Sequence, residues 1–158
     1  MQYNITEMTE AHIASLAELE SVCFSTPWTA EGLAEELSNP QAHFLVALCG
    51  ETVVGYIGVQ EIFDEAYITN VAVFPQYRKN GIASALLQAA VCGAAARDCA
   101  FITLEVRESN LPAVTLYRKA GFVPMGVRKN FYRLPDENAL IYTKTLRQHC
   151  TNRGARLT

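Results

Sequence analysis

Lysine and arginine are absent from the first 77 residues of the sequence. That half contains 11 carboxylates, whereas residues 78–158 contain all 13 basic residues and only five acids. Such a separation of charge favours two surfaces with different partners, an anion on the basic half and a cation on the acidic half. The same distribution is expected if the two halves neutralise each other where they touch, so charge alone leaves both interpretations open.

Long apolar runs are also missing. No run approaches the roughly 18 residues that a membrane-spanning helix requires, because glycine, glutamine or glutamate interrupts each one. The opening residues MQYNITEMTE place no basic residue ahead of an apolar stretch, so we expect no signal peptide. Since 50% of the residues are hydrophobic and 18% are charged, disorder is excluded. We expect a soluble cytoplasmic protein without a membrane partner.

The five cysteines form no C-x-x-C pair and are odd in number, so we expect neither a disulfide framework nor a metal site. Cys92 and Cys99 lie among alanines and are interpreted as small core residues. Neither has a histidine near it in sequence, which disfavours a cysteine nucleophile. The basic residues are scattered and the net charge is −3, which disfavours nucleic-acid binding.

The hydrophobic periodicity predicts an α+β protein with a central mixed sheet flanked by helices. Helices are expected at 10–23, 30–38 and 81–97, and from Asn110 to Ala120. Strands are expected at 43–49, 52–62, 66–74, 100–106, 122–133 and 139–146. Residues 1–147 therefore form one domain, and residues 148–158, which are almost free of apolar side chains, form a flexible tail.

The loop from Arg78 to Ser84 joins a predicted strand to a predicted helix and carries the first positive charges of the chain. Small residues at Gly81 and Ala83 would let a phosphate approach the backbone N–H groups at the start of the helix. The loop is neither a G-x-x-x-x-G-K-[ST] nor a G-x-G-x-x-G motif. It is therefore either a pyrophosphate cradle or a tight turn with two surface cations.

Two motifs carry a family resemblance. Asn70-Val71-Ala72-Val73 followed by Arg78-x-x-Gly81-x-Ala83 resembles the [R/Q]-x-x-G-x-[G/A] motif of the GCN5-related N-acetyltransferase (GNAT) family. About thirty residues later, Asn110-x-x-Ala113-x-x-Leu116-Tyr117-x-x-x-Gly121-Phe122 resembles the second signature of that family. The resemblance covers residues 3–146 and implies the GNAT fold with a splayed sheet, and acetyl-CoA as co-substrate.

Within the family, three segments resemble the branch that acetylates the N-terminal alanine of small-subunit ribosomal protein eighteen. They are Phe24-x-x-Pro27-Trp28, Leu104-Glu105-Val106-Arg107-x-Ser109-Asn110 and Arg128-Lys129-Asn130-Phe131-Tyr132. Ala83 is a departure, since members of that branch usually have glycine there. The resemblance implies direct transfer through a ternary complex, with the N-terminal segment of a ribosomal protein as partner and a monomer as the favoured state.

The resemblance also implies roles for individual residues. Contacts to acetyl-CoA are implied for Val71, Ala72, Val73, Arg78, Lys79, Asn80, Gly81, Ile82, Ala83, Ser84, Asn110 and Tyr117. The acceptor groove is expected to include Phe24, Trp28 and Tyr132, although aromatic residues at a helix break serve equally well as core.

Acetyl transfer requires a base for the amine and a proton for the departing thiolate. Glu105 lies near the end of an apolar strand on the face opposite Leu104 and Val106, and the resemblance makes it the base; the alternative is a surface ion pair with Arg107 or another cation. Tyr117 is the expected proton donor, and otherwise a core tyrosine.

Two other functions remain open on the sequence alone. The same fold acetylates small-molecule amines and lysine side chains, and a non-catalytic acyl-CoA sensor is a more distant alternative.

Overall fold

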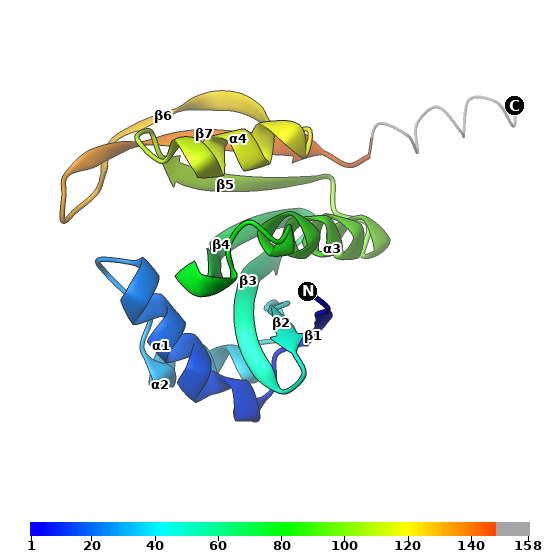
Figure 1. Cartoon of the computed structure of the whole chain (residues 1–158). Helices are drawn as coiled ribbons and strands as arrows, with labels where there is room; N and C mark the ends of the chain where they lie inside the picture. The colour runs from blue at the N-terminus through cyan, green and yellow to red at the C-terminus, as the bar shows by residue number, and fades with distance from the viewer. Residues whose placement is uncertain (148–158) are drawn as a thin grey trace, which may run out of the picture. The chain divides into compact units, whose positions relative to one another are not determined.

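The structure is a computed structural model that describes residues 1–147 (Figure 1). The predicted tail at 148–158 lies outside the described residues. The chain divides into two compact units, one formed by residues 1–60 and 68–90 and the other by residues 61–67 and those from 91 onward. β3 (Thr52–Ile62), β4 (Glu65–Val73) and α3 (Ile82–Ala96) contribute residues to both units.

The first unit contains β1 (Asn4–Glu7), β2 (Leu45–Cys49), β3 and β4 as neighbouring strands. β1 and β2 are antiparallel, as are β2 and β3. Its helices are α1 (Ile13–Cys23), α2 (Ala30–Leu37) and the start of α3, and two 3₁₀ turns cover Glu10–His12 and Pro75–Tyr77. Buried side chains of α1, α2 and β3, including Leu16, Leu33 and Tyr56, form its core.

The second unit contains β5 (Phe101–Arg107), α4 (Leu111–Lys119), β6 (Val123–Tyr132) and β7 (Glu137–Thr145). Residues 65–67 of β4 pair in parallel with residues 101–103 of β5, and β5 and β6 each pair antiparallel with β7. The strand order is β1-β2-β3-β4-β5-β7-β6, so the predicted α+β class and mixed sheet are confirmed.

Local sequence signals explain where the helices begin and end. Thr29 caps α2, since its hydroxyl accepts the N–H of Gly32 at 3.0 Å. The side-chain oxygen of Asn110 caps α4 by accepting the N–H of Ala113 at 3.2 Å. Beyond the end of α4, Gly121 has a φ of +90°, which a glycine adopts without steric cost.

Two expectations need correction. The helix predicted at 10–23 begins with a 3₁₀ turn at Glu10–His12 and becomes α-helical only at Ile13. Cys92 is exposed and not a core residue, because the buried face of α3 carries Leu86, Ala90 and Ala94 at a spacing of four, and position 92 points away from it. Cys99 is buried as predicted. No helix within residues 1–147 is long and apolar enough to cross a membrane.

Candidate active site

The loop before α3 is a tight turn with two left-handed residues. Lys79 and Gly81 both have left-handed backbone conformations, with φ of +65° and +75°. The Asn80 side-chain amide donates to the carbonyl oxygens of Tyr77 and Arg78 at 3.0 and 3.2 Å, and the Tyr3 hydroxyl donates to the Gly81 carbonyl at 3.3 Å. These contacts hold the loop while the first N–H groups of α3 lack intrahelical partners.

Gly81 leaves one side of this loop open. A Cβ atom built at Gly81 would meet no protein atom within 4 Å. The loop can therefore be approached closely at that point, and a side chain there would occupy the approach path. This geometry fits a phosphate group resting on backbone N–H groups at the start of a 15-residue helix.

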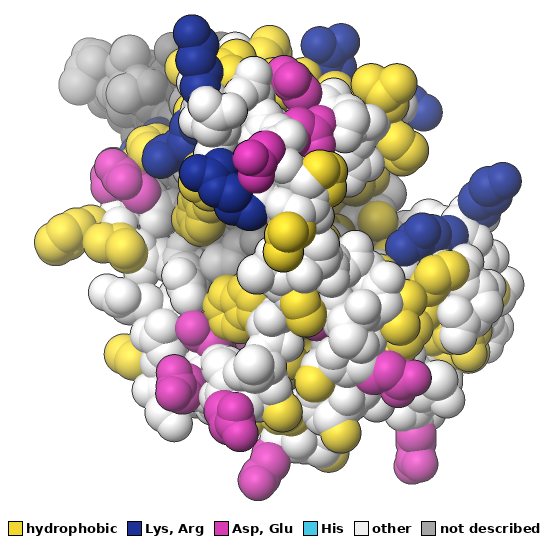
Figure 2. Space-filling model, turned by 90° about the vertical axis from the view of Figure 1, so that its left-hand side faces the viewer, with side chains coloured by type: hydrophobic (Ala, Val, Ile, Leu, Met, Phe, Trp, Pro, Cys, Tyr) yellow, Lys and Arg dark blue, Asp and Glu magenta, His cyan; other side chains and the backbone are white. Residues whose placement is uncertain are grey.

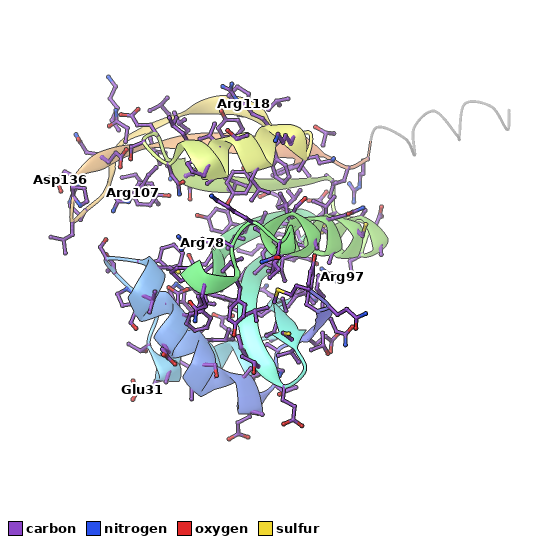
Figure 3. All side chains as sticks on the ribbon, in the orientation of Figure 1. Glu31, Arg78, Arg97, Arg107, Arg118 and Asp136 are labelled. Atoms are coloured by element: carbon purple, nitrogen blue, oxygen red, sulfur yellow. The ribbon has the colours of Figure 1, made fainter. Side chains whose placement is uncertain are left out.

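The side chain of Arg78, which lies on the loop before α3 (Figure 3), contacts the end of β4 and the end of α1. Its Nε donates to the Val73 carbonyl at 3.1 Å, and its Nη2 lies 3.5 Å from Cys23 Sγ. The guanidinium therefore fixes the end of β4. Val71 is half-buried on β4 and Ala72 is buried; Gly55 allows β3 to approach Ala72 closely, since a Cβ at Gly55 would lie 2.9 Å from the Ala72 carbonyl oxygen.

Glu105 is nearly buried on β5 and both its carboxylate oxygens have partners. Its side chain is 7% exposed. The Tyr67 phenol donates to Oε2, and Arg128 Nε lies 3.0 Å from Oε1. The sequence left open an ion pair of Glu105 with Arg107 or another cation; the structure shows such a pair with Arg128, whereas Arg107 pairs with Glu137 at 3.3 Å. The cation beside Glu105 comes from β6.

Tyr132 lies in the same cluster. The Arg107 guanidinium lies 4.5 Å from the centre of the Tyr132 ring, a cation–π contact. Burial and, secondly, the negative charge of Glu105 raise the pKa of Tyr132 to about 12. Arg107 also donates to the carbonyl oxygens of Arg133 and Pro135, each at 2.8 Å, at the end of the unit where β6 turns into β7 (Figure 3). It thus ties the β6–β7 hairpin to β5.

Tyr117 is buried on α4, with its ring centre 5.9 Å from that of Phe122. Burial raises the pKa of its phenol well above the usual range, and an electrostatic interaction with Tyr132 adds to the effect. The phenol is therefore fully protonated at neutral pH. Tyr132 interacts electrostatically with Glu105 and with Tyr117, all three of which belong to the second unit.

Phe24 and Trp28 lie in the first unit and both pack against its core. The Trp28 ring centre is 5.8 Å from that of Phe44. Both are half-buried: one side of each contacts the core, which agrees with the core interpretation, and the rest is accessible.

Glu20, which no sequence motif singled out, is completely buried on α1. Its carboxylate accepts from the Tyr56 phenol, the Asn70 side-chain amide and the Trp28 N–H. Burial raises the pKa of Glu20, while these three donors act in the opposite direction. The sequence did indicate this burial, because position 20 follows Leu16 by four residues and therefore lies on the apolar face of the helix.

The acidic residues of the first half of the chain fall into two groups in the structure, those paired with basic residues and those of the first unit. Glu61 pairs with Arg97 at 2.6 Å and Asp64 pairs with Arg147 at 2.8 Å, so part of the acidic half is neutralised by the basic half, as one interpretation expected. Within the first unit, however, Arg78 and Lys79 are the only basic residues beside eight acids. Acidic side chains are spread over the face shown in Figure 2 and do not form a single patch.

Within residues 1–147, no group of three or more histidine, cysteine or acidic side chains could hold a metal ion.

Comparisons with known proteins give consistent matches. The model of the acetyltransferase (GNAT) family matches residues 13–122. The [ribosomal protein bS18]-alanine N-acetyltransferase of Haemophilus ducreyi is 34% identical over 142 residues, covering 87% of this chain and 96% of that protein. The N-alpha-acetyltransferase RimI of Mycobacterium tuberculosis is 33% identical over 141 residues, covering 85% and 87%.

The crystal structure of the ribosomal-protein-S18-alanine N-acetyltransferase from Escherichia coli has the same fold, with a TM-score of 0.85 at 25% identity. It covers 92% of this chain, which in turn covers 94% of that one.

Proposed function

This chain belongs to the acetyltransferase (GNAT) family, and we propose that it transfers the acetyl group of acetyl-CoA to a protein N-terminus. The proposed acceptor is the α-amine of the N-terminal alanine of small-subunit ribosomal protein bS18. The observation that carries the proposal is the nearly buried carboxylate of Glu105, held between a phenol and a guanidinium in a chain whose relatives are named for this reaction.

Glu105 is the proposed base. An N-terminal α-amine has a pKa near 8, so much of it is protonated at neutral pH and must lose a proton before it can attack a thioester. Glu105 takes that proton, directly or through one water. The C–N bond then forms as the C–S bond breaks.

Tyr117 is the proposed proton donor to the leaving thiolate. Its raised pKa guarantees that the phenol carries its proton, but also makes it a weak acid beside a thiol of pKa about 8.5. Transfer must therefore accompany C–S cleavage and not follow it. Tyr132, which interacts with the charges of Glu105 and Arg107, is proposed to contact the acceptor. Phe24 and Trp28 are proposed acceptor contacts on the first unit.

Acetyl-CoA is proposed to bind through backbone groups. Of the loop from Arg78 to Ser84, the N–H groups of residues 79–84 would hold its pyrophosphate, and Val71, Ala72 and Val73 its pantetheine arm. The Arg78 side chain already donates to the Val73 carbonyl and its backbone N–H to the Pro75 carbonyl, so Arg78 supplies charge and no hydrogen bond. The Asn110 side-chain oxygen already accepts from Ala113, so Asn110 contributes its side-chain nitrogen.

The test is mass spectrometry of peptides incubated with enzyme and acetyl-CoA. The expected substrate is an alanine-initiated peptide with a free α-amine; the same peptide with that amine blocked and a lysine left free should gain no acetyl group. Acetylation of the blocked peptide would assign a lysine acetyltransferase, and turnover of small amines alone would assign the small-molecule alternative. No turnover on any amine, with acetyl-CoA bound, would indicate a sensor.

The acidic first unit makes a further expectation about the acceptor. A peptide with several arginines should have a lower KM than its glutamine counterpart, and the difference should fade with salt, because exposed charges are screened beyond about 8 Å at physiological ionic strength. A salt-independent difference would contradict electrostatic steering.

A further inference from the structure

Tyr67 is a β4 side chain that lies beside Glu105. Within the second unit, β4 pairs in parallel with β5 at Tyr67 and Thr103, which places Tyr67 one strand away from Glu105 and two residues behind it. From this position the Tyr67 phenol donates to Glu105 Oε2. The phenol is half-buried, and burial raises the pKa of Tyr67, so it carries its proton and can only act as the donor.

The two oxygens of Glu105 have unequal partners. Oε2 is held by a phenol anchored in a strand that continues into the first unit. Oε1 is met by Arg128, whose side chain is 58% exposed on β6. An ion pair to a guanidinium so exposed contributes little free energy, so it is exchanged readily for another cation. The Tyr67 contact is the fixed one and the Arg128 contact is replaceable.

We infer that Tyr67 is a positioning residue for the acetyl transfer: it fixes Glu105 Oε2, so that Oε1 faces the incoming amine in the place that Arg128 occupies. The phenol itself does not touch the reacting atoms. This role rests on the proposed function of Glu105 as the base. The positioning role therefore predicts which ligand takes the place of Arg128 at Oε1: a protonated primary amine.

Two effects follow from losing the Tyr67 hydroxyl. A donated hydrogen bond favours the ionised carboxylate, so its removal should move the acid limb of the pH profile of kcat/KM to higher pH. Without the Tyr67 hydrogen bond, the Glu105 carboxylate is also held less precisely, and imprecise orientation at a reacting centre lowers the rate about 10- to 100-fold. Arg128 and Tyr132, both on β6, also face Glu105, and both stay in place in the variant.

The experiment compares Tyr67→Phe with Tyr142→Phe. Tyr142 is a buried tyrosine of the same unit whose hydroxyl accepts from Arg118 Nε at 3.1 Å, so its replacement removes a phenol oxygen from another place. Profiles of kcat/KM against pH are measured for wild type and both variants with saturating acetyl-CoA. The acid limb should move for Tyr67→Phe and stay for Tyr142→Phe. An unmoved limb in a folded Tyr67→Phe variant, or an equal shift in both, would overturn the inference.

A second variant keeps the shape of the side chain. Fluorotyrosine incorporated at position 67 is a stronger donor of nearly the same size, so the acid limb should move in the opposite direction, to lower pH. This result is decisive even if Tyr67→Phe does not fold. A limb that moves upward, or does not move, would again overturn the inference.

Glu105→Gln separates this inference from the function on which it rests. If Glu105→Gln retains wild-type activity, Glu105 is not the base and both statements fail. If Glu105→Gln is impaired but neither Tyr67 variant changes the pH profile, only the positioning role fails. If both hold, adding Tyr67→Phe to Glu105→Gln should cause no further loss, because the group being positioned is already gone.

Discussion

Gly81→Ala tests the phosphate loop with the smallest possible side chain. The φ of +75° at Gly81 makes any alanine there strained, at a cost of about 1–2 kcal/mol in the free energy of unfolding. The added Cβ meets no protein atom within 4 Å, so the fold has no steric reason to fail. The methyl group instead occupies the open side of the loop, where the phosphate would approach the backbone N–H groups.

The size of the effect follows from those N–H groups. A hydrogen bond to a charged acceptor contributes about 1.5–3 kcal/mol. Losing one such bond should raise the Kd for acetyl-CoA about 10- to 150-fold, since each 1.4 kcal/mol is a factor of ten. Isothermal titration calorimetry measures this Kd directly, and urea unfolding measures the stability.

Gly50→Ala is the matched control. Gly50 has a φ of +62° in the turn between β2 and β3, and a Cβ there also meets nothing within 4 Å. Both variants should therefore lose a similar free energy of unfolding, whereas only Gly81→Ala should lose acetyl-CoA affinity. Equal affinity for acetyl-CoA in the two folded variants would refute the proposal that the loop from Arg78 to Ser84 binds the pyrophosphate.

Two further substitutions test the buried carboxylates. Glu105→Gln should lower kcat/KM by about 10²–10⁴-fold, and the loss should shrink above pH 8, where the amine arrives deprotonated; a defect that does not change with pH would make Glu105 a binding residue. Because burial raises the pKa of Glu20 above its ordinary value of 4.5, the native protein holds this proton more tightly than the unfolded chain does. The stability contributed by Glu20 is therefore lost as pH rises from that ordinary value through the raised one. Urea unfolding should show wild type losing stability relative to Glu20→Gln over this window, and a gain would contradict the assignment.

The predicted elements agree with the structure where periodic patterns and caps coincide. Thr29 and Asn110 each supply a side-chain oxygen at the position where a helix begins, and Gly121 follows a helix end. These are local signals, readable from a few neighbouring residues. β1 was missed because its four residues, Asn4–Glu7, are mostly exposed and carry no clear alternation. They become a strand by pairing with β2, more than 35 residues later in the chain.

The candidate site was predictable to the same extent. Motifs located the loop at Arg78–Ser84, Glu105 and Tyr117, since their spacing is local or shared with a family. The partners of these residues were not predictable. Tyr67 and Glu105 are 38 residues apart, and Glu20 reaches Tyr56 and Asn70 over 36 and 50 residues. No short-range pattern encodes which phenol meets which carboxylate.

Glu20 and Glu105 show why burial alone does not identify a candidate catalytic carboxylate. Glu20 is the more deeply buried, but its donors are two neutral side chains and a backbone N–H, all from the first unit, and they satisfy both oxygens without exposing either. Glu105 keeps one oxygen against an exposed cation, which solvent or substrate can replace. A carboxylate fully enclosed by neutral donors joins elements of a fold, whereas one with a replaceable cation can exchange a proton. The partner of a single oxygen therefore distinguishes Glu20, enclosed by the fold, from Glu105, the proposed base.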